Sequence, residues 1–413
     1  WVCDSNDAVQ FHQLNLTRPI TDHAEEVLET APTFLPEFTY PLFGEHEKIF
    51  GYKGLTIDVY FSQAALRTHL NVRYQAIHPT LKETPPSADS SGAPPAKRTK
   101  FTLDQAPENL AAYLARAKQT DAEFKPMGEC IHRYQAPLPQ SEHELVLRPV
   151  AEEEEVVENA TNPAGMSEDP PNGSFELYLA NFNTPGLPEY HRRIQSFLPF
   201  YIEGASFIDE DPQWDIYLLF RVLSVKLPES DVPVTRYALV GYSTVYRFYC
   251  YPDRVRPRIS QFLILPTYAG AGHGSEMYQV IHDRCLNDPK VIDLSVEDPN
   301  QAFSDLRDKW DVKRILQQGG AEDFSGPFDQ EFLNRFRLQW KLSKRQAARC
   351  LEMLMKIHLE DNEVDGAERA YRLQVKKRLY LQNKEALSEL EPAERIEKLQ
   401  ETFKNVDEDY TRI

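Results

Sequence analysis

Three glycines lie within five residues of this sequence, at Gly270, Gly272 and Gly274, in the segment AGAGHGS. Glycine lets the backbone come close to a ligand, and the first N–H groups of a helix that starts here lack partners within the helix. Such a turn suits an anion such as a pyrophosphate. Two adjacent acids that can exchange protons, Glu297 and Asp298, follow later at the end of an apolar stretch.

The residues around the glycines predict a strand, a turn, a helix and a second strand. Residues 262–265 are a continuous apolar run before Pro266, which is typical of a strand buried on both faces. Apolar residues at helical spacing then predict a helix that ends near residues 287–289. A second strand at 291–296 should run parallel to the first, after a right-handed crossover.

A glycine-rich turn alone fits either a tight turn or an anion site. In a P-loop, Lys and then Ser or Thr follow the last glycine, whereas Ser275 and Glu276 follow it here. A dinucleotide fingerprint has the spacing Gly-x-Gly-x-x-Gly with an acid closing the next strand. The spacing here is Gly-x-Gly-x-Gly, although Glu297 and Asp298 do end that strand.

The segments QFLILPTYAGAGHGS and VEDPNQAFSDLRD resemble the acetyl-CoA-binding core of the GNAT N-acetyltransferases. More narrowly, they resemble the family of type B histone acetyltransferase catalytic subunits, as do FGYKG, EYHRRIQSF, EGASFIDE and RPRISQFLI. The resemblance covers most of the chain from Phe34 onward. One departure is Ala269, where the GNAT pattern has Gln or Arg. Since main-chain N–H groups would hold the phosphates, we expect little loss from it.

The resemblance implies a histone lysine acetyltransferase that uses acetyl-CoA and no metal, and it gives three acids a catalytic role. It assigns the general base to Glu297, with Asp298 and Glu203 as supporting or alternative acids. Neighbouring residues of a strand face opposite ways, so Glu297 and Asp298 can both face the amine only if the strand has ended.

The other expected site residues fall into two groups. The expected acetyl-CoA contacts are Phe262, Leu263, Ile264, Ala269, Gly270, Ala271, Gly272, His273, Gly274, Ser275, Asn300 and Phe303. The expected histone contacts are Glu45, His46, Glu47, Tyr246, Arg247 and Phe248. Two alternatives stay open: a solvated hairpin tip for the acids at 45–47, and plain sheet packing for the aromatic residues.

The predicted fold class is α+β, with a GNAT core whose sheet is mixed, mostly antiparallel and has splayed parallel strands. The predicted parts are an N-terminal α+β domain at 1–150 with a disordered insertion at 83–100, an acidic linker at 151–173, the acetyl-CoA-binding domain at 174–318, and a helical domain at 319–413.

Local patterns predict further elements in each part. Strands are expected at 56–61, 70–74, 130–134, 144–147, 175–179, 215–222, 237–243 and 245–251. Helices are expected at 109–117, 187–207, 328–358, 367–387 and 394–403. Pro199 should kink the second of these helices.

The net charge limits the classes of partner that the protein can bind. The net charge of -18, from 64 acids against 46 bases, would repel a nucleic acid and favours a basic partner, unless it serves only solubility.

The five scattered cysteines suggest neither a disulfide framework nor a zinc site, which fits a reducing compartment. No apolar run reaches ~18 residues, so no membrane span is expected. Because the chain begins with Trp1, an N-terminal signal stays open.

The resemblance also implies a substrate, a partner and a location. The substrate would be free, newly made histone H4, at tail lysines flanked by glycine, and the partner a WD40-repeat histone chaperone. The location would be cytoplasmic and nuclear, with Lys97-Arg98-Thr99-Lys100 as a candidate import signal.

Two other functions stay open: a GNAT enzyme acting on small amines, and a histone-binding scaffold with little or no turnover. Glu297 and the glycine loop argue against the scaffold, and the long terminal additions argue against a small-molecule enzyme.

Overall fold

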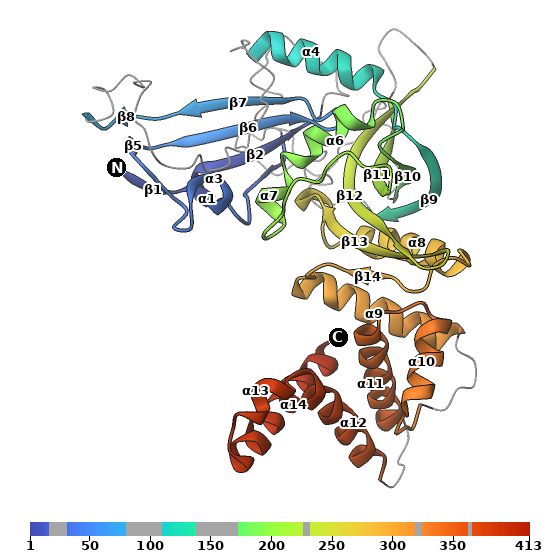
Figure 1. Ribbon diagram of the computed structural model, residues 1–413. Coiled ribbons are helices and arrows are strands. Elements are labelled where there is room, and N and C mark those ends of the chain that lie inside the picture. Colours follow the sequence, from blue (N-terminus) through green and yellow to red (C-terminus); the bar gives the residue numbers. More distant parts are fainter. Residues whose placement is uncertain (16–30, 80–109, 138–171, 226–231, 319–323, 362–365) are drawn as a thin grey trace, which may run out of the picture. The chain divides into compact units, whose positions relative to one another are not determined.

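The computed structural model describes residues 1–15, 31–79, 110–137, 172–225, 232–318, 324–361 and 366–413 (Figure 1). The expected insertion at 83–100, the basic run at 97–100, the strand at 144–147 and nearly all of the 151–173 linker lie outside the described residues. Among the described helices, none is both long and apolar enough to cross a membrane.

The described chain divides into two compact units. The first comprises Trp1–Thr244 and Gln261–His273, and the second comprises Val245–Ser260 and Gly274–Ile413. Two long strands and the glycine loop therefore pass from one unit to the other. This division does not follow the domain boundaries drawn from the sequence, which stay a prediction.

The N-terminal part of the first unit contains a four-stranded sheet of order β3-β2-β6-β7 (Figure 1). Strand β2 (Val9–Leu14) pairs parallel with β6 (Thr56–Ser62), which pairs antiparallel with β7 (Thr68–Arg73). The last two are the strands expected at 56–61 and 70–74. The short elements of this part are β1 (Val2–Asp4), α1 (Ser5–Ala8), β3 (Thr33–Phe34), α3 (Tyr40–Phe43), β4 (Lys48–Phe50), β5 (Tyr52–Lys53) and β8 (Ala76–Ile77). Helix α4 (Leu110–Glu123) is longer than the helix expected at 109–117.

A six-stranded sheet of order β14-β13-β12-β11-β10-β9 carries the segment that holds the predicted site (Figure 1). Its strands are β9 (Glu129–Pro137), β10 (Asn172–Ala180), β11 (Trp214–Val225), β12 (Val234–Cys250), β13 (Arg254–Ile264) and β14 (Ser295–Val296). Strand β10 pairs antiparallel with β9 and β11, and β13 pairs parallel with β14, as expected. The predicted α+β class with a mixed sheet is confirmed.

Three strand predictions differ from the structure. Strand β9, expected to close the N-terminal domain, pairs with β10 of the larger sheet. The strands expected at 237–243 and 245–251 are one continuous strand, β12. The strand expected at 291–296 is only two residues long. Val291 forms an isolated parallel bridge with Val255 of β13, but the N–H of Leu294 donates to the Lys341 carbonyl, which interrupts the pairing before Ser295.

The helix expected at 187–207 is broken into α6 (Leu187–Gln195) and α7 (Leu198–Tyr201). Pro199 lies in the first turn of α7, where its missing N–H costs nothing because that N–H would have no partner within the helix. The sequence thus located the interruption correctly but predicted too long a helix.

After β13, a 3₁₀ turn (Pro266–Tyr268) leads to α8 (His273–Asn287), and the elements described after β14 are all helices. The helices are α9 (Gln301–Gln318), α10 (Gln330–Gln339), α11 (Lys344–Asp361), α12 (Ala367–Gln382), α13 (Lys384–Ser388) and α14 (Pro392–Arg412). The helices expected at 328–358 and 367–387 are each two helices. The first break lies at residues 340–343, where Lys341 has a positive φ of 48°.

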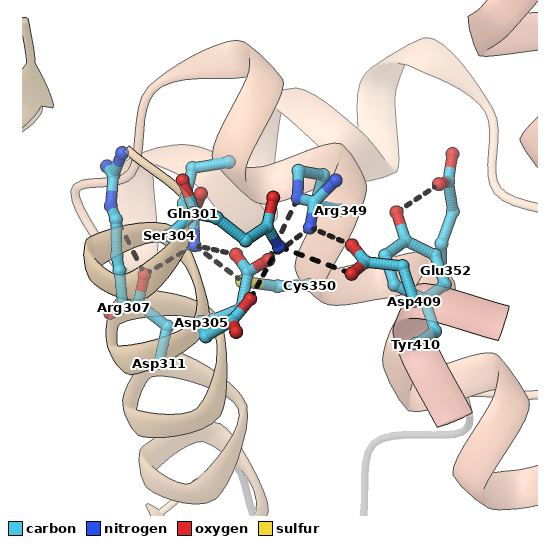
Figure 2. A network of polar contacts seen from close by, with 12 residues as sticks. Gln301, Ser304, Asp305, Arg307, Asp311, Arg349, Cys350, Glu352, Asp409 and Tyr410 are labelled. Carbon is cyan, nitrogen blue, oxygen red and sulfur yellow. Dashed lines mark hydrogen bonds and ion pairs between the residues drawn. The ribbon is translucent and has the colours of Figure 1, made fainter. Parts of the chain in front are cut away.

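A buried polar network ties α9 to α11 and α14 (Figure 2). Gln346 donates to Asp308 and Asp311, at 2.8 and 2.9 Å, and Arg349 donates through its Nε to Asp308 at 2.9 Å. Burial raises the pKa of Asp311 to about 6. Buried charges are tolerated when their partners are in place, so this network fixes α9, the helix that follows Glu297, within the second unit.

Candidate active site

Strand β14 ends at Val296, directly before Glu297, the predicted general base. Ser295 and Val296 pair with Arg258 and Ile259, and the Glu297 N–H donates to the Ile259 carbonyl at 2.9 Å. The parallel pairing stops there, whereas β13 runs on to Ile264.

Ser260 orients the Glu297 carboxylate. Its hydroxyl donates to Glu297 Oε2 at 2.6 Å. A charge-assisted bond of this length fixes the direction of the carboxylate while Oε1 keeps its acceptor capacity. Ser260 was not among the predicted site residues. Its place beside the strand end follows from the parallel register of β13 and β14, which no local pattern in the sequence indicates.

Asp298 turns away from strand geometry, with a positive φ of 31°. Because the strand has ended, the alternation rule no longer sets the directions of Glu297 and Asp298. Both side chains are exposed.

Asn300 and Phe303, two expected acetyl-CoA contacts, lie at the start of α9. The Phe303 N–H donates to Asn300 Oδ1 at 2.9 Å, so the Asn300 side chain caps the helix. The Phe303 ring packs edge-on against Tyr278 of α8, with 5.9 Å between ring centroids. The structure thus gives both residues a local structural role. Contact with acetyl-CoA stays a prediction.

The glycine loop requires glycine at two positions. Gly270 and Gly272 have φ values of 79° and 88°, a region that side chains with a Cβ rarely adopt. A Cβ atom added at either glycine meets no atom within 4 Å, so this side of the loop is open. Ala269, Gly270 and Gly272 are exposed, while Ala271 is half-buried. An open backbone surface of this kind fits close approach by a phosphate.

Gly274 and Ser275, two further expected acetyl-CoA contacts, lie in the first turn of α8 and are half-buried. In β13, Leu263 is buried while Phe262 and Ile264 are half-buried. The apolar run at 262–265 was expected to be buried on both faces. It instead alternates, with one face in the core and the other partly open.

The side chain of His273 faces the core. It is 1% exposed, its Nδ1 lies 2.8 Å from the Tyr134 hydroxyl, and its ring packs on Phe175 at 4.3 Å. Burial lowers the pKa of His273 to about 4, so the ring is neutral at physiological pH. His273 was expected to contact acetyl-CoA, and because its side chain is buried, this prediction now applies only to its main-chain atoms. The imidazole anchors the end of the loop.

Removing the Tyr134 hydroxyl tests this anchor. Tyr134→Phe is expected to lower the free energy of unfolding by about 1 kcal/mol, because one hydrogen bond to a buried ring is lost. The loosened loop should bind acetyl-CoA about threefold to tenfold more weakly. Urea denaturation and calorimetry measure the two effects. Unchanged acetyl-CoA affinity in a destabilised variant would contradict a link between the anchor and the cofactor site.

Glu203 lies in the segment 202–208 after α7, not on a helix as expected. Its side chain is exposed. The N–H of Gly204 donates to the Tyr40 hydroxyl at 2.8 Å, and the N–H of Ile208 donates to Gln195 Oε1 at 2.9 Å. The segment that carries Glu203 is therefore held at fixed points.

The three neighbouring residues at 45–47, expected to contact the histone, have different surroundings. Glu45 and His46 are exposed in a turn. Glu47 instead accepts hydrogen bonds from the N–H groups of Thr39 and Tyr40, at 2.7 and 3.0 Å, and from Asn6 at 2.8 Å. The bond from the Thr39 N–H is the main cause that lowers the pKa of Glu47. Its carboxylate thus holds the start of α3, a role that the sequence did not suggest.

Tyr246 and Phe248 share one face of β12, with 4.7 Å between ring centroids. The guanidinium of Arg258 lies 4.8 Å from the centre of the Phe248 ring. Arg247, on the other face, forms an ion pair with Asp288 at 3.3 Å. The two aromatic residues are placed to line a surface together, whereas the Arg247 charge is already paired.

Other candidate chemistry is sparse in the described residues. They contain no group of three or more His, Cys, Asp or Glu side chains arranged to hold a metal ion. The five cysteines are free thiols, and Cys285 and Cys350 are buried.

Two family models match the sequence. The model "Histone acetyl transferase HAT1 N-terminus" matches residues 1–203, and "Fungal HAT1, C-terminal" matches residues 308–359.

Curated relatives match over the full length. A histone acetyltransferase type B catalytic subunit of Cryptococcus neoformans is 35% identical over 100% of this chain and 97% of the relative. Its counterpart in Mycosarcoma maydis is 35% identical over 92% of this chain and 83% of the relative. The human protein of the same name is 30% identical over 100% of this chain and 92% of the relative.

Proposed function

This chain belongs to the family of histone acetyltransferase type B catalytic subunits, and is thus an acetyltransferase of histones. We propose that it acetylates tail lysines flanked by glycine on free, newly made histone H4. We also propose that acetyl-CoA and the histone are bound together, with Glu297 as the general base. The observation that carries the mechanism is the Glu297 carboxylate at the end of β14, hydrogen-bonded to Ser260.

The proposed chemistry needs a base. Free lysine titrates near 10.4, so keeping its amine neutral at pH ~7.4 costs about 4 kcal/mol. Glu297 would take the ammonium proton, and the neutral amine would attack the thioester carbonyl. The C–S bond then breaks, leaving an amide on the lysine and a thiolate that takes up a proton. Asp298 and Glu203 are the supporting acids.

Two parts of the chain are suited to bind acetyl-CoA. The open sides of Gly270 and Gly272, with the first turn of α8 next in sequence, would receive the pyrophosphate. The main chain of residues 262–264, beyond the point where β14 stops pairing, would lie along the pantetheine arm. The transfer is direct, without an acyl-enzyme. Burial of Cys285 and Cys350 is in keeping with that.

The acidic balance supports a cationic substrate. With a net charge of -18, the protein attracts a lysine-rich tail and repels nucleic acid. We also propose, from the resemblance alone, a WD40-repeat histone chaperone as the partner and the cytoplasm and nucleus as the location.

Paired substrate assays test the proposed function. With acetyl-CoA, we expect an H4 tail peptide to be acetylated with a kcat/KM at least about a hundredfold above that for spermidine. Higher turnover of spermidine would favour a small-amine enzyme. Tight binding of H4 without turnover would favour the scaffold.

A further inference from the structure

A chain of buried hydrogen bonds ends at the segment that carries Glu203. His191 Nε2 lies 2.6 Å from the Tyr242 hydroxyl, and that hydroxyl lies 3.1 Å from Gln261 Oε1. Gln261 Nε2 lies 2.8 Å from the Ser206 carbonyl oxygen. All four residues belong to the first unit. His191 is 1% exposed, Tyr242 1% and Gln261 4%, while Ser206, at the end of the chain, is exposed.

The direction of every bond in this chain follows from its last member. A carbonyl oxygen only accepts, so the Gln261 atom that faces Ser206 must be the amide nitrogen. The amide oxygen then faces Tyr242, which must donate its proton to it. His191, in turn, donates its Nε2 proton to the tyrosine oxygen. Burial lowers the pKa of His191 to about 4, so the ring is neutral at physiological pH. The bond to Tyr242 then requires the tautomer that carries its proton on Nε2.

Hydrogen bonds that all run in one direction strengthen one another, because each donor group is polarised by the bond that it accepts. Its members come from three elements, with His191 on α6, Tyr242 on β12 and Gln261 on β13. Gln261 directly precedes the residues expected to contact acetyl-CoA. Its own N–H donates to the Thr244 hydroxyl at 3.1 Å, so the backbone at this point is also held by a side chain.

The segment 202–208 therefore has three fixed points. Gly204 is held by Tyr40, Ser206 by Gln261, and Ile208 by Gln195. Of these three bonds, the one at Ser206 connects the segment to β13. It gives a direct link between the segment that carries Glu203 and the strand expected to contact acetyl-CoA.

We propose that Gln261 is a positioning residue for acetyl transfer, which sets the Glu203 segment against β13 and is itself held by Tyr242 and His191. The inference rests on the proposed function, since it takes Glu203 as a supporting acid. Gln261 touches neither substrate in this account. It acts through Ser206.

Two tyrosine variants separate positioning from stability. Tyr242→Phe removes the middle donor of the chain. Tyr190→Phe, the matched control, removes a buried hydroxyl that donates to the Ala64 carbonyl at 2.8 Å and has no part in the chain. Both variants should be destabilised to a similar extent in urea. Tyr242→Phe should lower kcat about threefold to tenfold with an unchanged KM for acetyl-CoA, whereas Tyr190→Phe should keep the parent kcat.

A third variant reverses one bond. Gln261→Glu places a carboxylate against the Ser206 carbonyl, where two acceptors repel, and should lower kcat further than Tyr242→Phe. Equal kcat values for Tyr242→Phe and Tyr190→Phe would overturn the inference, as would a Gln261→Glu variant that is folded and fully active. A parent protein that does not acetylate histone would instead contradict the proposed function. That outcome is seen without any variant, so it can be told apart from the two outcomes above.

Discussion

Glu297→Gln is expected to lower kcat by about 10²–10⁴, because the amide keeps the shape of the carboxylate but cannot take the lysine proton. The amide oxygen still accepts the Ser260 hydroxyl, so the strand end should keep its geometry. Steady-state kinetics with an H4 tail peptide measure the loss. Calorimetry should give the parent affinity for acetyl-CoA.

Ser260→Ala is the companion to this variant. It removes the group that orients Glu297 but keeps the base, so its loss in kcat should be about tenfold or less. A Glu297→Gln variant that keeps more than about a tenth of the parent kcat would contradict the assignment of the base.

Gly272→Asp is expected to weaken acetyl-CoA binding by about a hundredfold or more, or about 3 kcal/mol. Two effects combine: a φ of 88° is strained for any residue with a Cβ, and the new carboxylate repels a pyrophosphate. The added Cβ itself meets no atom within 4 Å. Calorimetry with acetyl-CoA measures the change.

Two controls separate strain from charge. Gly272→Ala adds strain alone and should have a smaller effect. Gly366→Asp places the same residue at a φ of 81°, also in open space, ahead of α12. It should leave acetyl-CoA binding unchanged. Parent affinity in Gly272→Asp would remove the loop from the cofactor site.

Local patterns predicted the elements around the site well. The apolar run, Pro266 and the glycines fix a strand, a turn and a helix start within a few residues of each other, and the structure has all three. The length of β14 could not be predicted in this way. It depends on which distant carbonyls the N–H groups of residues 291–297 reach, and those partners lie near Val255, Ile259 and Lys341.

The same limit applies to individual site residues. Nothing local distinguishes Glu47, which holds α3, from the exposed Glu45 two residues earlier. His273 lies between two glycines at the start of α8, yet its partners Tyr134 and Phe175 come from β9 and β10. Ser260 and Gln261 are ordinary polar residues of a strand. Their roles follow from strand register and burial, which a single sequence does not contain.

The most direct test of Glu297 as the base is the pH dependence of kcat/KM for Glu297→Gln and Glu203→Gln beside the parent. Without its base, Glu297→Gln depends on substrate that is already neutral. Its kcat/KM should therefore rise about tenfold per pH unit below the lysine pKa of ~10.4. Glu203→Gln should show a smaller defect and keep the parent profile. A larger defect and a steeper pH profile for Glu203→Gln would contradict the account and move the base from the end of β14 to the segment after α7.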